Sequence, residues 1–306
     1  MWRWGVLDAY IHSLEMANHH DAYLLAWIRN QLGNAYFQKR DFRTALYNYQ
    51  KANDYTLRID GQDPLTAKIH LNLAVVYRIL GHTKDCVSFL ESSHGFFHKN
   101  SDLKHLSKVL YERGIISKTL KQYERAAEYF EQARTIMVTL NLKHYANLVQ
   151  HMIASQVTIH NNPVAAIHQL QACIERFQEE ENYPLVILEY SKIAEIYLQL
   201  KDLETAVSSL EHAVRIMTNF SLEQTPESAE CFRVYAIYFF LRKEYTASIE
   251  YALKAANSFD TMGLIKDQAD AMKIVVDCYQ QLGDLEQALL LERQRNNLLT
   301  TLVIKE

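Results

Sequence analysis

A pattern of small and aromatic residues returns along the chain about every 40 residues, and this period restricts the fold more than any other feature. The first copy lies in the stretch NQLGNAYFQKRDFRTALYNYQKA and consists of Gly33, Tyr36, Ala45, Tyr49 and Ala52. The six later copies start at Ala74, Gly114, Ala154, Ala194, Ala236 and Val276. The intervals between these starting residues are 41, 40, 40, 40, 42 and 40 residues, which is too regular for chance.

Two antiparallel helices that pack closely account for this spacing. A small residue at the start of each copy and another twelve positions later let the two backbones approach, while the aromatic residue three positions after the start fills the remaining space. In the fourth copy, Pro163 is expected to begin the second helix, with Asn161 or Asn162 as its cap. One hairpin cannot bury both of its faces, whereas stacked hairpins share a continuous core. The sequence therefore predicts an all-α fold of about seven helical hairpins.

The composition supports a helical protein and excludes several classes of partner. Of the 306 residues, 49% are hydrophobic, and only 8 Gly and 4 Pro interrupt the chain. The formal net charge of −4 gives no electrostatic footprint for nucleic acid, and the sequence contains no polybasic membrane tract. We therefore expect no direct nucleic-acid binding by this chain and no membrane partner.

Cysteine usage and the N-terminal sequence bear on the cellular compartment. The four cysteines, Cys86, Cys173, Cys231 and Cys278, lie far apart inside helical patterns, so neither a zinc site nor a disulfide framework is predicted. The opening MWRWGVLDAYIHSLEMA lacks an apolar segment followed by a small-residue cleavage site. We expect a reducing, cytoplasmic location.

The repeats divide the sequence into two predicted parts. Residues 26–306 form the repeat domain, with copies that start near residues 26, 67, 107, 147, 187, 229 and 269. Residues 1–25 are interpreted either as a capping helix or as the remnant of an upstream repeat, because Leu14 and Ala17 match second-helix positions. The second interpretation leaves room for an upstream effector domain.

No sequence motif indicates catalysis. Dinucleotide-binding, P-loop, serine-hydrolase and zinc-protease signatures are missing. None of the 13 histidines has carboxylate or cysteine partners at metal-ligand spacing on one helical face. The run Glu179–Glu181 fits a solvated connector better than an acid–base pair. We predict that the chain is not an enzyme and that it carries neither a cofactor nor a metal.

The repeat resembles the tetratricopeptide family, whose LGxxY…A…F…A signature occurs here as LGNAY followed by Ala45, Tyr49 and Ala52. The resemblance covers about residues 26–300. It implies a right-handed superhelix of about seven hairpins whose first helices line a concave surface. Because the family period is about 34 residues, the longer period found here implies longer second helices or longer connectors.

Helical geometry selects the side chains that face this concave surface: those one position after, three before and four after the starting residue of each copy. Candidate peptide-contacting residues at these positions are Asn30, Asn34, Phe37, Arg78, Tyr111, Lys118, His151, Glu195 and Arg233. Amides interleaved with single charges and apolar groups suit an extended peptide, because an Asn side chain can both donate to and accept from one peptide unit.

Some tetratricopeptide domains hold the terminal carboxylate of a peptide in a clamp of Lys and Asn side chains. By this resemblance the matching residues are Asn34, Asn72 and Lys108, while Asn30 and Glu112 stand where that clamp has cations. Losing two cations and gaining an anion is expected to cost a carboxylate several kcal/mol of attraction. We therefore disfavour a co-chaperone that binds chaperone tails.

The seven copies, the missing catalytic motifs and the asparagines resemble the sensor domain of the Rap, NprR and PlcR group of bacterial peptide-pheromone receptors. This resemblance implies a quorum-sensing regulator that binds a short signalling peptide on its concave surface. Binding would change its conformation or oligomeric state and so control transcription or a partner protein. The residues that grip the peptide backbone would be Asn30, Asn34 and Asn72, and those that pair with an acidic side chain or the carboxylate would be Arg78, Lys118 or Arg233.

A constitutive scaffold is the alternative function. Lengthened repeats also occur in adaptors of the kinesin light chain and polarity-scaffold types, which bind a folded protein partner. Convex residues such as Tyr123, Glu128 and Tyr129 would serve such a partner. A homodimer through the C-terminal repeats is compatible with both functions. The sequence leaves open the identity of the peptide or partner, the regulated genes and the oligomeric state.

Overall fold

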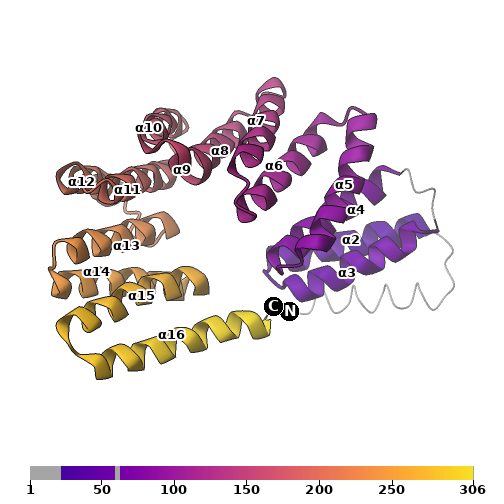
Figure 1. Cartoon of the computed structure of the whole chain (residues 1–306). Coiled ribbons are helices and arrows are strands. Elements are labelled where there is room, and N and C mark those ends of the chain that lie inside the picture. Colours follow the sequence, from indigo (N-terminus) through magenta and orange to yellow (C-terminus); the bar gives the residue numbers. More distant parts are fainter. Residues whose placement is uncertain (1–21, 59–62, 306) are drawn as a thin grey trace. The chain divides into compact units, whose positions relative to one another are not determined.

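Helices are the regular elements of the described chain. A computed structural model describes residues 22–58 and 63–305, and within these ranges the helices pair into seven antiparallel hairpins (Figure 1). The hairpins are, in chain order, α2 (Ala22–Gln38) with α3 (Phe42–Thr56), α4 (Pro64–Ile79) with α5 (Thr83–Lys99), α6 (Leu103–Thr119) with α7 (Tyr123–Thr139), α8 (Lys143–Ile153), the π-helix η1 (Ala154–Thr158) and α9 (Ile159–Asn161) with α10 (Pro163–Glu179), α11 (Tyr183–Gln199) with α12 (Leu203–Asn219), α13 (Pro226–Leu241) with α14 (Tyr245–Thr261), and α15 (Ile265–Leu282) with α16 (Leu285–Lys305). The predicted all-α repeat fold is confirmed.

The chain divides into two compact units, one ending at Ala146 and one running from Asn147 to Lys305. In the N-terminal unit, α2 contacts α4 and α4 contacts α6; in the C-terminal unit, α11 contacts α13 and α13 contacts α15. Within each unit, neighbouring hairpins therefore meet through their first helices, and the second helix of one hairpin also packs against the first helix of the next. We call the surface that the first helices carry the first-helix face. It comprises α2, α4 and α6 in the N-terminal unit, and α8 from Asn147 onward, α11, α13 and α15 in the C-terminal unit.

The small starting residues lie where the two helices of a hairpin come closest. A Cβ atom at Gly33 would lie 2.4 Å from Cε1 of Tyr49, and one at Gly114 would lie 2.6 Å from Cδ1 of Phe130. Both rings are buried, and Tyr49 is only 2% exposed. The predicted close approach is confirmed at these two positions. The ring that fills the space lies sixteen positions after the glycine, whereas the sequence pattern predicted a ring three positions after it.

The long period arises from both helices of each hairpin. α6, α7, α11 and α12 each contain 17 residues. The turns that join them are short, as between Thr119 and Tyr123. The expectation of longer second helices or longer connectors was therefore wrong in part, because the first helices are equally long and the connectors are brief.

The expectation for residues 1–25 falls largely on residues 1–21, which lie outside the described part of the chain. Residues 22–25 are the first residues of α2. The other first helices begin about one helical turn before the repeat starts that the sequence suggested.

Several local expectations are met. The side chain of Asn162 caps α10 by accepting a hydrogen bond from the backbone N–H of Ala165 at 3.0 Å, and Pro163 lies in the first turn, so the predicted cap is confirmed. The four cysteines are buried free thiols. Among the described helices, none combines the length and the apolar character that crossing a bilayer requires.

The turns between helices place one residue in the left-handed conformation. Gly81, Gly263 and Gly283 fill this position in three turns, with φ of 79°, 68° and 82°. Non-glycine residues fill it in other turns: Arg40, Ser101, Lys121, Asn141, Glu181, Lys201, Ser221 and Lys243. A side chain in this region costs about 1–2 kcal/mol. Helix packing therefore sets the turn geometry even where the sequence does not favour it.

We predict that Lys121→Gly stabilises the protein. Lys121 is exposed and has a φ of 59°, so glycine relieves left-handed strain and gains about 0.5–1 kcal/mol after its own entropic cost. Equilibrium urea unfolding measures the change. Gly81→Ala is the reciprocal control. Its added Cβ meets no atom within 4 Å, so the expected loss of stability comes from the positive φ alone. A destabilised Lys121→Gly variant would contradict the argument.

Gly114→Ala is expected to destabilise the N-terminal unit. The new Cβ would overlap the buried ring of Phe130, and overpacking of this kind costs about 1–3 kcal/mol. The double variant Gly114→Ala with Phe130→Leu should recover part of the loss, because the smaller side chain makes room. Thermal unfolding of the three variants tests the contact. If the stability lost by the double variant equals the sum of the losses of the two single variants, the ring does not require the glycine.

Candidate functional site

An asparagine cluster lies on the first-helix face of the N-terminal unit. Asn30 and Asn34 lie one turn apart on α2, and Asn72 lies on α4. The Nδ2 group of Asn72 donates to Oδ1 of Asn30 at 2.9 Å and to Oδ1 of Asn34 at 3.2 Å. The structure thus brings together three of the predicted peptide-contacting residues.

Asn34 also has a structural role. Its Oδ1 atom accepts a hydrogen bond from the hydroxyl of Tyr49 at 2.8 Å, and its Nδ2 group donates to Gln31 at 3.0 Å. Burial raises the pKa of Tyr49, so its hydroxyl remains a donor at neutral pH. Replacing Asn34 by Ala would leave the Tyr49 hydroxyl without this acceptor, at a cost of about 1–3 kcal/mol. Asn34→Ala is therefore expected to lower the thermal midpoint.

Two amide groups of the cluster keep unused hydrogen-bonding capacity. Within the described residues, Nδ2 of Asn30 donates no hydrogen bond and Oδ1 of Asn72 accepts none. A peptide unit has one N–H donor and one C=O acceptor. The cluster therefore offers, side by side, one donor and one acceptor that match a peptide unit.

Arg78 on α4 is already paired with an acidic residue. Its Nε atom lies 2.6 Å from Oε2 of Glu112 on α6. Glu112 is buried, and this burial raises its pKa although Arg78 opposes the shift. The cation proposed for a peptide carboxylate is thus engaged by Glu112, so a ligand carboxylate would have to compete with it.

The remaining predicted residues of the N-terminal unit do not join the asparagine cluster. The ring of Phe37 packs edge-on against Phe42 at a centroid distance of 5.4 Å, and Tyr111 packs against Phe130 at 5.6 Å. Lys108 is exposed on α6, and Lys118 is half-buried in the last turn of that helix. Phe37 and Tyr111 therefore serve packing at least as much as recognition.

In the C-terminal unit, His151 of α8 contacts Glu189 of α11 across the first-helix face. The His151 Nδ1 atom lies 2.8 Å from Oε1 of Glu189, a side chain that is 0% exposed. Ser155 lies one turn along, in η1, and its Oγ atom is 3.4 Å from Nε2 of His151. Burial raises the pKa of Glu189, and the His151 hydrogen bond opposes that shift.

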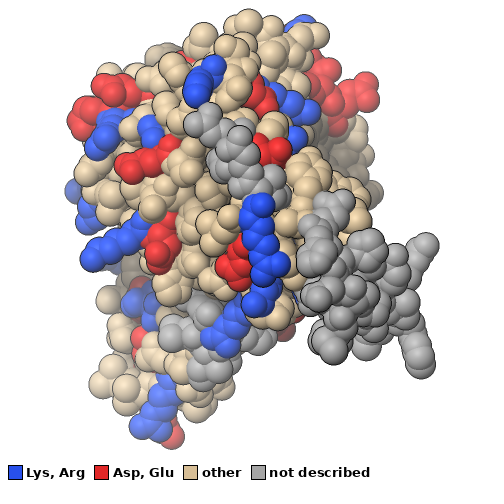
Figure 2. Space-filling view, turned by 90° about the vertical axis from the view of Figure 1, so that its right-hand side faces the viewer, with Lys and Arg blue, Asp and Glu red and all other residues tan. Residues whose placement is uncertain are grey.

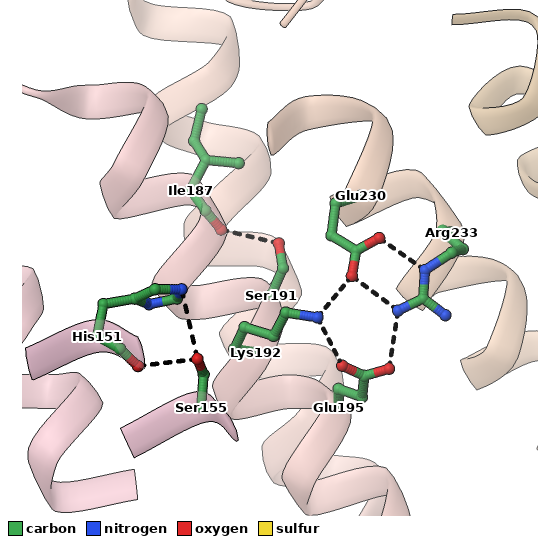
Figure 3. Close-up of polar contacts among 8 residues, drawn as sticks. All are labelled: His151, Ser155, Ile187, Ser191, Lys192, Glu195, Glu230 and Arg233. Carbon is green, nitrogen blue, oxygen red and sulfur yellow. Dashed lines mark hydrogen bonds and ion pairs between the residues drawn. The ribbon is translucent and has the colours of Figure 1, made fainter. Parts of the chain in front are cut away.

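A four-residue ionic network continues along the same face. Lys192 of α11 contacts Glu230 of α13 at 2.7 Å, and Arg233 of α13 contacts Glu195 of α11 at 2.8 Å (Figure 3). Arg233 also contacts Glu230 at 2.6 Å, and Lys192 contacts Glu195 at 3.0 Å. Burial alone would raise the pKa of Glu230, but the hydrogen bonds and charges of Arg233 and Lys192 hold it at about 2. Two cations and two anions therefore compensate one another on this face.

His151, Glu195 and Arg233 are among the residues predicted from the sequence, and Glu195 and Arg233 contact each other. Glu189, Lys192 and Glu230 complete the contacts, and the pairs His151–Glu189, Lys192–Glu230 and Glu195–Arg233 are each separated by 38 residues. Asn34 and Asn72 have the same separation. A search for complementary polar residues 38 positions apart would have found these pairs.

Charges elsewhere are dispersed. On the face of the molecule shown in Figure 2, basic and acidic side chains are interspersed among uncharged residues. No group of three or more histidine, cysteine, aspartate or glutamate side chains within the described residues has a geometry that could hold a metal ion. The polar features that single out a candidate site are therefore the asparagine cluster and the two sets of contacts on the C-terminal unit.

Curated proteins match parts of the chain. A family model described as Soluble NSF attachment protein, SNAP, matches residues 117–266, slightly less than half of the chain. The transcriptional activator NprA of Geobacillus stearothermophilus is 20% identical over 186 residues, which cover 61% of this chain and 46% of that protein. The Hsp70-Hsp90 organizing protein 1 of Glycine max is 32% identical over 110 residues, covering 34% of this chain and 18% of that protein. The chain spans less than half of the length of these two relatives.

Solved structures match the fold over most of the chain. Aspartyl phosphate phosphatase F from Bacillus subtilis superposes with a TM-score of 0.71 at 14% identity, covering 94% of this chain and 73% of that chain. The Rap conjugation gene regulator of the plasmid pLS20, in complex with the Phr* peptide, superposes with a TM-score of 0.61 at 16% identity, covering 91% of this chain and 76% of that chain. The chain therefore has the repeat fold of these solved structures. Within this fold, the asparagine cluster and the ionic network both belong to first helices.

Arg233→Gln is expected to destabilise the C-terminal unit by about 2–3 kcal/mol at pH 7. The variant removes the guanidinium that contacts both Glu195 and Glu230 in a mostly buried setting. The folded pKa of Glu230 is depressed, so its contribution is present above the unfolded value of 4.5 and is lost as pH falls toward about 2. The variant should therefore lose less stability than the wild type over that range. Urea unfolding at several pH values tests this, with exposed Arg215→Gln as the matched control. Parallel pH profiles would refute it.

Proposed function

We propose that the chain is the peptide-binding sensor part of a quorum-sensing regulator. The observation that carries this proposal is the pair of unused amide groups on Asn30 and Asn72, one donor and one acceptor, on the first-helix face of a Rap-like fold. Support comes from a fold neighbour solved with a Phr* peptide and from a sequence relative named as a transcriptional activator. The peptide-contacting residues inferred from the sequence are part of this proposal.

Recognition would start from the peptide backbone. Asn30 donates to a peptide carbonyl and Asn72 accepts from a peptide N–H, so the ligand bridges α2 and α4. Arg78 and Arg233 are engaged by carboxylates of the chain itself, so an acidic ligand group gains less from them than the sequence suggested. Backbone amides therefore contribute more of the affinity than ligand charge does.

The output would be mechanical. Within each unit, neighbouring hairpins are in contact, so a peptide that bridges two first helices of one unit favours one arrangement of those hairpins over others. Such a shift would change conformation or oligomeric state in the cytoplasm and control transcription or a partner protein. The effector that acts on DNA or on that partner would lie in another domain or another chain, without direct nucleic-acid binding by the repeats.

A scaffold that binds a folded protein is the second candidate function. The likeness to the Hsp70-Hsp90 organizing protein favours it, as do large apolar side chains exposed on α16. Leu285 and Leu289 lie one turn apart there, and each is 62% exposed. Such a stripe would suit a protein partner or a second copy of this chain, which would form the homodimer through the C-terminal repeats.

The deciding experiment is a thermal-shift screen of the purified chain against hepta- to decapeptides, followed by titration of any hit. Asn30→Asp keeps the oxygen that accepts from Asn72 but removes the donor offered to the ligand. The affinity of a peptide found in the screen should therefore fall about tenfold or more, which corresponds to about 1.4 kcal/mol. Exposed Asn297→Asp provides the same charge change away from the face. Light scattering with and without the peptide reports any change in mass.

Two outcomes would remove this proposal. If no peptide at about 100 μM raises the midpoint, where a micromolar ligand should stabilise by about 2.7 kcal/mol, the receptor function loses its support. If a hit binds Asn30→Asp as tightly as the wild type, the asparagine cluster is not the site. A folded protein that co-purifies with the chain and is released by charged substitutions at Leu285 would instead favour the scaffold.

A further inference from the structure

Glu189 is an unusual residue on the first-helix face because its carboxyl group is fully buried and only half satisfied. Its Oε1 atom receives the hydrogen bond from His151, whereas Oε2 is buried and has no hydrogen-bond partner within the described residues. A buried acceptor without a donor costs free energy, and a buried charge costs more. Glu189 is therefore in a setting that favours a proton on or beside its carboxyl group.

The surroundings of His151 lead to the same conclusion. The Nδ1 atom faces Oε1 of Glu189. The Nε2 atom faces Oγ of Ser155, whose hydrogen is already donated to the backbone oxygen of His151 at 2.8 Å (Figure 3). Both ring nitrogens thus face oxygen atoms that can accept a hydrogen bond, an arrangement that an imidazolium satisfies. The pair can hold one shared proton in either of two places.

Other titratable groups near Glu189 do not replace that proton. Lys192, on the same helix, acts on Glu189 through its charge, but its ammonium is already bound to Glu195 and Glu230. From α10, Cys173 faces the carboxyl group, and burial, followed by the charge of Glu189, raises the pKa of this thiol to about 12. The thiol therefore stays neutral. His151 is the group that hydrogen-bonds to Glu189 and can share its proton.

We propose that the His151–Glu189 pair is a proton-operated clasp that ties α8 to α11. With one proton shared between the two side chains, the clasp is closed, because the imidazole and the buried carboxyl group are joined without an uncompensated charge. When the proton leaves, a buried carboxylate with one unsatisfied oxygen remains beside a neutral ring, and the contact weakens. The clasp operates in the unligated chain and does not rest on the proposed peptide.

The π-helix gives the clasp a segment on which to act. η1 follows α8 directly, and Ser155, the second residue of η1, is the partner of the His151 ring. A π-helical turn is a rare geometry that is frequently found at functional sites. Opening of the clasp frees the His151 ring, and with it the contact of Ser155, from α11, so α8 and η1 are the elements expected to loosen first.

The sign of the pH dependence follows from Glu189. Burial raises the folded pKa of Glu189 above its unfolded value of 4.5, so the stability that its proton contributes is complete below that value. The contribution is lost as pH rises through the folded pKa. An unfolded histidine keeps its proton up to its ordinary pKa of about 6.5. One proton therefore leaves on unfolding between that pH and the folded pKa of the pair, and there the unfolding equilibrium constant should rise by about tenfold per pH unit.

Urea unfolding of the wild type, Glu189→Gln and the exposed control Glu223→Gln between pH 5 and 9 tests the clasp. The amide of Gln keeps an acceptor for His151 but cannot ionise. The wild type and Glu223→Gln should weaken relative to Glu189→Gln as pH rises, so that the gap between them widens by about tenfold per pH unit in the unfolding constant. Curves that stay parallel across this range would overturn the proposal.

A measurement on the wild type keeps the test valid if Glu189→Gln fails to fold. Nitrogen-15 shifts of the His151 ring, together with the carboxyl carbon shift of Glu189, report where the proton lies at each pH. The clasp is supported if the two side chains lose one shared proton in a single coupled step above the ordinary carboxyl range. The amide hydrogens of α8 and η1 should then also exchange faster, beyond the intrinsic effect of pH. A Glu189 carboxyl that ionises in the ordinary range, independently of His151, would refute it.

Discussion

The close approach of two helices inside each hairpin is the constraint on which the rest of this structure depends. At Gly33 and Gly114 there is no room for even a Cβ atom, because the ring of a buried aromatic residue from the second helix occupies that space. This contact fixes the distance and the rotation of the two helices. Within each unit, the first helices of neighbouring hairpins then meet and their side chains come into contact. The polar surface that they carry is a consequence of the apolar packing beneath it.

Several polar contacts of the first-helix face join residues 38 positions apart, while Asn30–Asn72 and Arg78–Glu112 are separated by 42 and 34 residues. Residues 38 positions apart meet on adjacent first helices, whether they are amides, as in Asn34 and Asn72, or charged groups, as in Lys192 and Glu230. The side chains that seemed free to bind a ligand are therefore also bonds between hairpins. A ligand on this face must use the capacity that those bonds leave over, or break them. Recognition and repeat geometry are in this way coupled through the same atoms.

Much of the fold could be predicted from the sequence, but less of the site. The period, the cap at Asn162 and the small residues at Gly33 and Gly114 are local signals, and each carries its structural meaning within one hairpin. The partner of Arg78 depends on how the next first helix packs and on the side-chain rotamers. The sequence of α4 alone predicts the cation but not that Glu112 pairs with it. The period also did not show that both helices of a hairpin are longer, because a longer first helix, second helix or connector gives the same period.

The polar contacts on the first helices are of two kinds. Around Asn30 and Asn72 the groups are amides, whose hydrogen bonds do not depend on pH and whose burial carries no cost of removing a charge from water. Around Glu189 and Glu230 they are ionisable, and the network holds together because each charge has an opposite partner. Uncharged donors and acceptors suit recognition of a peptide backbone. Compensated charges suit a contact that must be specific between hairpins and that can respond to protons.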